Sequence, residues 1–100
     1  MKRFDDRVLE LTARIPEGKV ATYRDLARAL HTTAYRAVGQ ALRRNEHPIE
    51  IPCHRVVRSD GRVGGYAGKQ ESAKKVALLR GEGIPIRKGR IDLARYGHRF

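Results

Sequence analysis

The proline-framed segment at the centre of the chain, His47-Pro48-Ile49-Glu50-Ile51-Pro52, constrains the fold more than any other feature. Proline fixes its own φ angle and disfavours helical conformation in the residue before it, so no helix can run through this segment. Hydrophobic spacing typical of amphipathic helices precedes it, and turn signals and a glycine-rich stretch follow it. We therefore expect a helical first half, an extended central segment and a second half with more loops.

Hydrophobic spacing predicts three short helices before the prolines. The first covers residues 4–14. The second covers residues 22–31 and begins with a cap-like pair, Thr22 and Asp25. The third covers residues 33–44. The second and third helices together predict a helix-turn-helix, in which one helix crosses the DNA backbone and the next enters a groove.

The second half of the chain carries shorter signals. Val56-Val57 and Arg62-Val63 stand on either side of the turn sequence Ser59-Asp60-Gly61, which predicts a small hairpin or wing. A fourth helix is expected over residues 70–81, because two glycines follow its last apolar residues. The tail, residues 84–100, holds one possible strand.

Length and charge bound the class of protein. The chain has 100 residues, which is enough for one small domain, residues 1–100, expected to be mainly α with a small β hairpin and a winged-helix-like helix-turn-helix. It carries 22 Lys and Arg against 11 Asp and Glu, a formal charge of +11. An excess this large favours an anionic partner, nucleic acid first, because basic side chains that neutralise phosphates release counterions. The arginine-rich surface of a heat-adapted protein is the alternative.

One cysteine excludes an intramolecular disulfide, and the N-terminus shows no cationic leader followed by an apolar stretch. No apolar run approaches the roughly 20 residues of a membrane span. We expect a cytoplasmic protein without membrane contact. The four histidines, His31, His47, His54 and His98, lack paired ligand spacing, so we expect no metal and no cofactor.

The single cysteine, Cys53, stands in the string Pro52-Cys53-His54-Arg55. Thiolate is the nucleophilic form of cysteine, and neighbouring cationic groups lower the thiol pKa from its free value of roughly 8.5. A free cysteine is more often a small buried hydrophobe, so Cys53 alone leaves both interpretations open. Adjacent side chains of an extended segment point to opposite faces, which predicts a bridging water between Cys53 and His54.

Five strings occur in an order that resembles a known family: Gly18 to Tyr23, Arg36 to Gly39, Asn45, Ile51 to Val56, and Gly64 to Gly68. Over about residues 3–84 the chain resembles the alkylguanine-DNA alkyltransferases, also called methylated-DNA-protein cysteine methyltransferases. The resemblance implies direct repair of double-stranded DNA that contains alkylated guanine. An alkyl group on the exocyclic oxygen of guanine would be transferred irreversibly to the cysteine, so each molecule would act once.

The resemblance also implies catalytic roles. Cys53 would be the nucleophile, activated through water by His54 and Glu82. Tyr23 would donate a proton to the departing guanine, and Lys75 would polarise that tyrosine. From the residues alone, Glu82 could equally be a charge at a helix end and Tyr23 a core aromatic. Asn45 would tie the turn before the active-site segment by side-chain hydrogen bonds, or act as a helix C-cap.

An enzyme that acts on a base inside a duplex must flip the nucleotide out. The resemblance assigns Arg36 to fill the vacancy, and the alternative is a phosphate-facing arginine. Other expected DNA contacts lie on or near the third helix: Thr22, Ala34, Tyr35, Ala37, Gly39 and Arg43. The residues expected to wall the base pocket are Pro48, Val56, Gly64, Gly65, Tyr66, Ala67 and Gly68.

Two other functions remain open. The chain and its tail, Gly89 to Tyr96, also resemble the small alkyltransferase-like proteins, which bind the same lesions, lack the cysteine and flag the damage for excision repair. Excision-repair proteins are therefore candidate partners. A regulator that reads DNA sequence is the weakest alternative, because base-edge readers place polar side chains on the recognition helix, whereas this one is rich in alanine and glycine.

Overall fold

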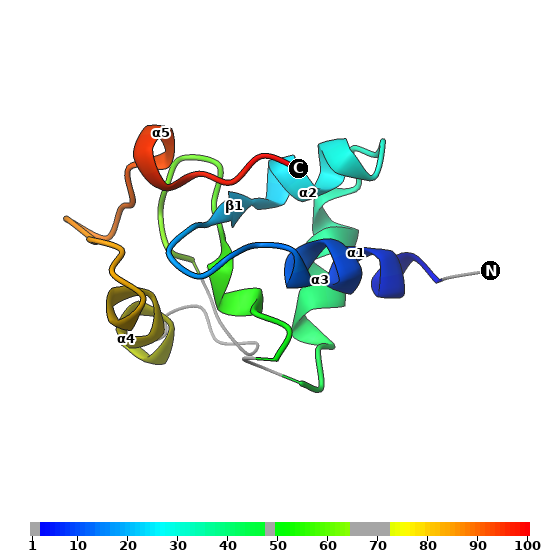
Figure 1. Ribbon diagram of the computed structural model, residues 1–100. Coiled ribbons are helices and arrows are strands. Elements are labelled where there is room, and N and C mark those ends of the chain that lie inside the picture. The colour runs from blue at the N-terminus through cyan, green and yellow to red at the C-terminus, as the bar shows by residue number, and fades with distance from the viewer. Residues whose placement is uncertain (1–2, 48–49, 65–72) are drawn as a thin grey trace.

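The computed structural model describes residues 3–47, 50–64 and 73–100 of the chain. Its elements, in chain order and labelled as in Figure 1, are α1 (Phe4–Ala13), β1 (Ala21–Thr22), α2 (Tyr23–Ala29), α3 (Tyr35–Arg43), the 3₁₀ helix η1 (Cys53–Arg55), β2 (Val56–Val57), α4 (Ala73–Gly81) and α5 (Leu93–Tyr96). The described chain is thus mainly helical, as predicted, and α5 is a helix that the sequence did not predict. No helix among the described residues is long and apolar enough to cross a membrane.

The helix-turn-helix is formed by α2 and α3. Thr22 Oγ1 accepts a hydrogen bond from Asp25 N at 3.0 Å, and Asp25 Oδ2 accepts one from Thr22 N at 2.9 Å. This reciprocal cap starts α2 and confirms the predicted pair. His31, at a φ of 57°, turns the chain towards α3, which packs its buried face against α1 and α2.

The predicted hairpin between Val56-Val57 and Arg62-Val63 is wrong. β2 pairs in parallel with β1, so that Ala21 lies opposite Val56 and Thr22 opposite Val57. Both valines of β2 have no exposed surface, and strands buried in this way belong in the middle of a fold rather than on a solvent-facing wing. The turn after β2 instead leads Arg62 to a bridge with Arg90 of the tail.

The central segment also departs from prediction at the cysteine. The predicted extended conformation is wrong, because Ile51 N donates to His47 O at 2.9 Å and closes a turn. Residues 53–55 then form one turn of 3₁₀ helix in which Arg55 N donates to Pro52 O at 2.9 Å. Consecutive side chains of such a turn fan out by about 120°, because it has three residues per turn. Cys53 and His54 therefore diverge through helical geometry rather than through strand alternation.

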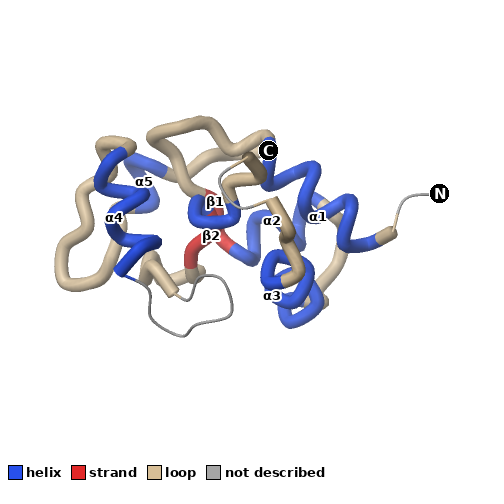
Figure 2. The backbone as a smooth tube through the Cα atoms, turned by 90° about the horizontal axis from the view of Figure 1, so that it is seen from below, coloured by secondary structure: helices blue, strands red, loops and turns tan. Residues whose placement is uncertain are grey.

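Figure 2 shows α1, α2 and α3 on one side of the strands and α4 and α5 on the other, and the described residues form two hydrophobic clusters. The first is built by α1, α2, α3 and Val56, and the second by α4, the tail and Val57. The tail returns to the start of β1, where Val20 N donates to Tyr96 O at 2.9 Å and His98 N donates to Val20 O at 2.7 Å. η1 stands between the clusters, which places Cys53 and His54 where the two halves of the molecule meet.

Candidate active site

The thiol of Cys53 is half-buried at the first residue of η1 and packs against the first hydrophobic cluster. Asn45, just after α3, holds the segment that leads to it. Asn45 Nδ2 donates to Ile51 O at 3.0 Å, and Asn45 Oδ1 accepts from His47 N at 2.9 Å. These bonds fix both ends of the central turn, in agreement with the position expected for this asparagine.

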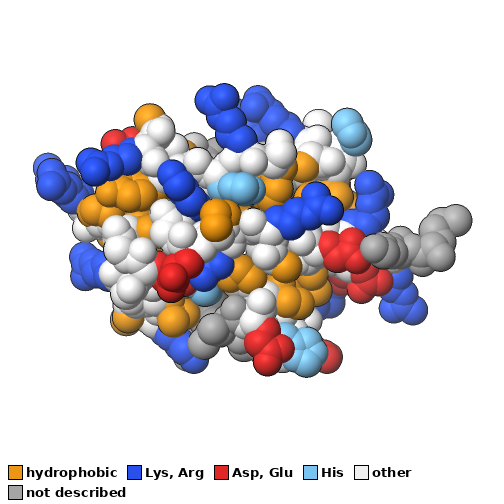
Figure 3. All heavy atoms as spheres, viewed as in Figure 1, with side chains coloured by type: hydrophobic (Ala, Val, Ile, Leu, Met, Phe, Trp, Pro, Cys, Tyr) orange, Lys and Arg blue, Asp and Glu red, His pale blue; other side chains and the backbone are white. Residues whose placement is uncertain are grey.

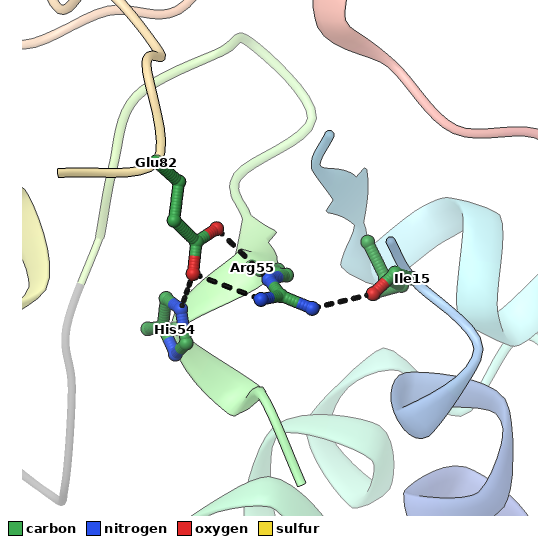
Figure 4. A network of polar contacts seen from close by, with 4 residues as sticks. All are labelled: Ile15, His54, Arg55 and Glu82. Atoms are coloured by element: carbon green, nitrogen blue, oxygen red, sulfur yellow. Dashed lines mark hydrogen bonds and ion pairs between the residues drawn. The ribbon is translucent and has the colours of Figure 1, made fainter. Parts of the chain in front are cut away.

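The two residues that follow the cysteine, His54 and Arg55, join a network of polar contacts with Glu82 and Ile15 (Figure 4). His54 is 1% exposed, and its Nε2 lies 2.8 Å from Glu82 Oε2, just beyond the end of α4. Arg55 donates to both oxygens of the same carboxylate, from Nε to Oε1 and from Nη2 to Oε2, each at 2.9 Å. Its Nη1 also donates to Ile15 O at 2.7 Å. The structure thus brings His54 and Glu82 together, although 28 positions separate them in the sequence.

The carboxyl of Glu82 is held in its ionised form. Burial raises its pKa, but the hydrogen bonds and positive charges of Arg55 and His54 outweigh burial, so the pKa lies below its ordinary value. An ionised Glu82 can orient the imidazole of His54 and stabilise it when it carries a proton, as the third member of a catalytic triad does.

Tyr23 of α2 and Lys75 of α4 interact electrostatically with Cys53. Burial, and then the negative charge of an ionised Cys53, raise the pKa of Tyr23, while the charge of Arg58 lowers it. Lys75 of α4 has no exposed surface, and its Nζ donates to Val56 O at 2.7 Å. Burial lowers the pKa of Lys75 to about 8, and the charge of Cys53 opposes that shift. Both side chains are therefore electrostatically coupled to the cysteine.

The exposed side of α3 carries most of the residues expected to contact DNA. Ala34 is its N-cap, Arg36 is exposed in the first turn, and Arg43 is exposed in the last turn. Tyr35 is 45% exposed, and Ala37 and Gly39 are half-buried. Thr22 is only 6% exposed and its hydroxyl caps α2, so it does not belong to this surface.

Few of the expected pocket residues can be placed. Gly64, half-buried with a φ of 77°, lies close to Lys75, since a Cβ added to it would be 3.9 Å from Nζ. Val56 is fully buried in the first hydrophobic cluster, and its carbonyl faces Lys75. Pro48, Gly65, Tyr66, Ala67 and Gly68 lie outside the described residues.

Arg55 is the site residue that sequence reasoning missed. It was considered only as a cation beside the thiol, yet its guanidinium joins Glu82 to Ile15 O. A signal for this was absent, because its partners lie 27 and 40 positions away. No group of three or more His, Cys, Asp or Glu side chains suited to a metal occurs within the described parts of the chain.

The fold and the site together define a class: a helix-turn-helix domain that carries a half-buried thiol next to a His–Glu pair. A family of that class, described as the DNA-binding domain of 6-O-methylguanine DNA methyltransferase, matches residues 3–84. The chain belongs to this family.

Individual relatives agree with this family assignment. The chain is 48% identical over 85 residues to a methylated-DNA–protein-cysteine methyltransferase of Archaeoglobus fulgidus, covering 81% of this chain and 56% of that protein. It is 51% identical over 88 residues to a bifunctional methyltransferase/endonuclease of Picrophilus torridus, covering 86% of this chain but 28% of that protein. The chain thus spans between about a quarter and a little over half the length of these relatives.

A solved structure matches over the full length. Atl1 of S. pombe, in complex with damaged DNA containing O6-carboxymethylguanine, superposes with a TM-score of 0.86 at 27% identity and covers 100% of both chains. The tail beyond residue 84 therefore has a counterpart in a protein of this fold, although the family match ends there.

Proposed function

We propose that this chain repairs DNA directly, by transferring an alkyl group from the exocyclic oxygen of guanine to the sulfur of Cys53. The observation that carries the proposal is a half-buried thiol beside the His54–Glu82 pair, in a domain of the methyltransferase family. Methyltransferase relatives of similar sequence support it, and so does the complex of Atl1 with alkylated DNA.

The nucleophile is the thiolate of Cys53. Its proton passes through a water to Nδ1 of His54, because Nε2 is bonded to Glu82. The ionised carboxylate of Glu82 stabilises the imidazolium that forms. Lys75, whose pKa burial lowers to about 8, stays mostly protonated at neutral pH and provides a positive charge that interacts with Cys53.

In the transfer step the sulfur attacks the alkyl carbon, so that a sulfur–carbon bond forms as the carbon–oxygen bond breaks. The electron pair of the broken bond moves into the guanine ring, which leaves more readily when a ring nitrogen takes up a proton. Tyr23, whose hydroxyl is protonated at neutral pH, supplies that proton. The alkylated sulfur has no route back, which makes the protein single-use.

The base reaches the thiol by flipping out of the duplex. Arg36, exposed on the first turn of α3, enters the stack in its place, while Ala34, Ala37 and Gly39 let the helix approach the groove closely. Arg36→Ala should therefore weaken binding to lesion-bearing duplex more than to a single strand, which has no vacancy to fill. Equal losses on both would contradict this role. Because the function depends on a free thiol, we place it in the reducing cytoplasm.

The alternative is a protein that binds the lesion without transfer and leaves repair to excision-repair partners. The full-length match to Atl1, a protein in complex with damaged DNA, is compatible with this alternative as well as with transfer. Intact-protein mass after incubation with a duplex carrying one O6-methylguanine separates the two. Transfer predicts a gain of one methylene on Cys53, saturating at one per molecule and absent in Cys53→Ser. Tight, lesion-selective binding with unchanged mass would establish the alternative instead.

A further inference from the structure

The tail forms a small antiparallel ladder with the loop that follows β2. Arg90 lies in its middle, with an antiparallel bridge to Arg62 on one side and to Arg87 on the other. The turn between Arg87 and Arg90 is tight, since each of these residues donates to the carbonyl of the other at 3.0 Å. Lys88 and Gly89 have positive φ angles of 52° and 75°, as in a type I′ hairpin turn.

Directly opposed residues of such a ladder project their side chains from the same face, with Cβ atoms about 4.5–5.5 Å apart. The Arg62–Arg90 pair is of the closer, non-hydrogen-bonded kind, because the flanking bonds run from Val63 N to Gly89 O and from Ile91 N to Gly61 O. Arg62, Arg90 and Arg87 therefore form one line across three chain segments, which we call the arginine row.

Like charges placed directly opposite each other destabilise a ladder. The carboxylate found beside the row is that of Asp60, whose Oδ2 lies 3.5 Å from Arg62 Nε. The backbone hydrogen bond from Arg62 lowers the pKa of Asp60, and the charges of Arg62, Arg58 and Arg90 add to that effect. One exposed carboxylate cannot balance these three cations. A row of this kind is stable where an external anion lies against it.

Arg58 connects the arginine row to the active site. Arg58, at the start of the turn, packs under Gly64, where an added Cβ would lie 3.2 Å from its Cγ, and its charge acts on Tyr23. Figure 3 shows Lys and Arg side chains along the left edge of the molecule, where Figure 1 places the tail. From residue 84 to the C-terminus the chain has five Arg and Lys and one Asp.

We propose that the arginine row binds backbone phosphates of the DNA strand that carries the flipped nucleotide, beyond the part covered by α3. This rests on the proposed function in that DNA is the ligand. Arg58 acts on Tyr23 by its charge and donates from its N to Arg62 O at 2.9 Å, so in this proposal the strand whose nucleotide enters beside Tyr23 passes Arg58 and then the arginine row. Phosphates are regularly spaced anions, and arginine binds them in a bidentate manner. Two of the three arginines lie beyond the family match, so this contact belongs to the tail.

The salt dependence of binding to an undamaged duplex tests the proposal. Each phosphate contact contributes about 0.9 to the slope of log Kobs against log salt, so Arg87→Gln/Arg90→Gln should make that slope shallower by about 1.8. Between 50 and 200 mM salt, wild-type affinity should then fall about 12-fold more than that of the variant. The matched control is Arg7→Gln/Arg14→Gln, in α1 and at its C-cap, which removes the same charge from other exposed positions and should leave the slope unchanged.

The melting temperature supplies a second readout. If the like charges of the arginine row repel one another, Arg87→Gln/Arg90→Gln should melt at the same temperature as wild type or higher. Lost DNA binding by this variant could then not be ascribed to unfolding. Arg62→Gln, which leaves the tail hairpin intact, should reduce the slope by about half as much.

A slope equal to that of the α1 control would overturn the proposal, and would mean that the row binds an anion other than DNA, such as an acidic protein. All of these measurements use undamaged duplex and can be repeated in Cys53→Ser. Their outcome is therefore independent of whether transfer occurs.

Discussion

Arg55 should contribute more to stability than any exposed arginine of this chain, and Arg55→Met tests that. The side chain of Arg55 and that of Glu82, with which it forms an ion pair, are only 16% and 11% exposed. Removing one partner of a buried ion pair leaves the other charge uncompensated, at a cost of about 3–5 kcal/mol. Because some exposure remains, we take about 3 kcal/mol, which for a domain of this size lowers the melting temperature by roughly 12–24 °C.

The control is Arg44→Met. Arg44 also grips a carboxylate with two hydrogen bonds, to Asp5 at 2.7 and 3.0 Å, but its side chain is 59% exposed. Water and salt screen such a pair, so its loss should change the melting temperature far less. Thermal unfolding followed by circular dichroism compares the two variants. Equal shifts would refute the reasoning, because burial would then not be what distinguishes the pairs.

A double-mutant cycle extends the test to the site. If Arg55 acts through Glu82, Arg55→Met should have a much smaller effect in a Glu82→Gln background than in wild type. This applies to two measurements, the stability and the rate at which iodoacetamide alkylates Cys53, both of which Arg55→Met should lower. Additive losses would mean that Arg55 acts mainly through Ile15 O.

Other substitutions probe the remaining buried groups. The pKa of Lys75 falls from 10.5 to about 8 on folding, so the unfolded chain binds more protons than the folded one between these pH values. The free energy of unfolding should therefore rise from pH 8 to 10.5 by up to about 3 kcal/mol. Lys75→Met, compared with wild type by denaturant titration at several pH values, should lose that rise. Gly61→Ala should be more destabilising than Gly83→Ala by at least about 1 kcal/mol in urea titrations. Both glycines have positive φ angles, but only a Cβ at Gly61 would meet a backbone oxygen, at 2.7 Å. Equal losses of stability would exclude a role for this clash. Tyr23→Phe should slow transfer by about 100-fold with unchanged affinity for the lesion, measured by single-turnover kinetics, and an unchanged rate would remove Tyr23 from proton transfer.

The helices could be predicted because their signals are local. The cap of α2 lies within four consecutive residues, and the buried positions of α3 recur at helical spacing. Strand pairing has no such signal. Val56-Val57 could be recognised as a strand, but its partner lies some 35 positions away in β1 rather than across the next turn. The tail helix α5, four residues long, was too short for its periodicity to be seen.

The site residues likewise divide into those that the sequence could predict and those that it could not. Cys53, His54 and Glu82 could be named from the sequence because the resemblance of whole strings identified them, and the structure joins His54 to Glu82. Thr22 was predicted to contact DNA, but it is 6% exposed and its hydroxyl caps α2. Arg55 and the arginine row could not be assigned, since each depends on residues brought together from distant parts of the chain.

The sequence by itself determined the helix-turn-helix, the single thiol, the excess of basic charge and the resemblance to a repair family, because composition, local periodicity and contiguous motifs are properties of neighbouring residues. Only the tertiary structure decided that Arg55 shares the Glu82 carboxylate with His54, which strand pairs with Val56-Val57, and that three arginines stand in one line. The reason is physical. A hydrogen bond, a buried pair or a row of like charges depends on distances in space, and those distances are fixed only when the two hydrophobic clusters pack the distant segments together.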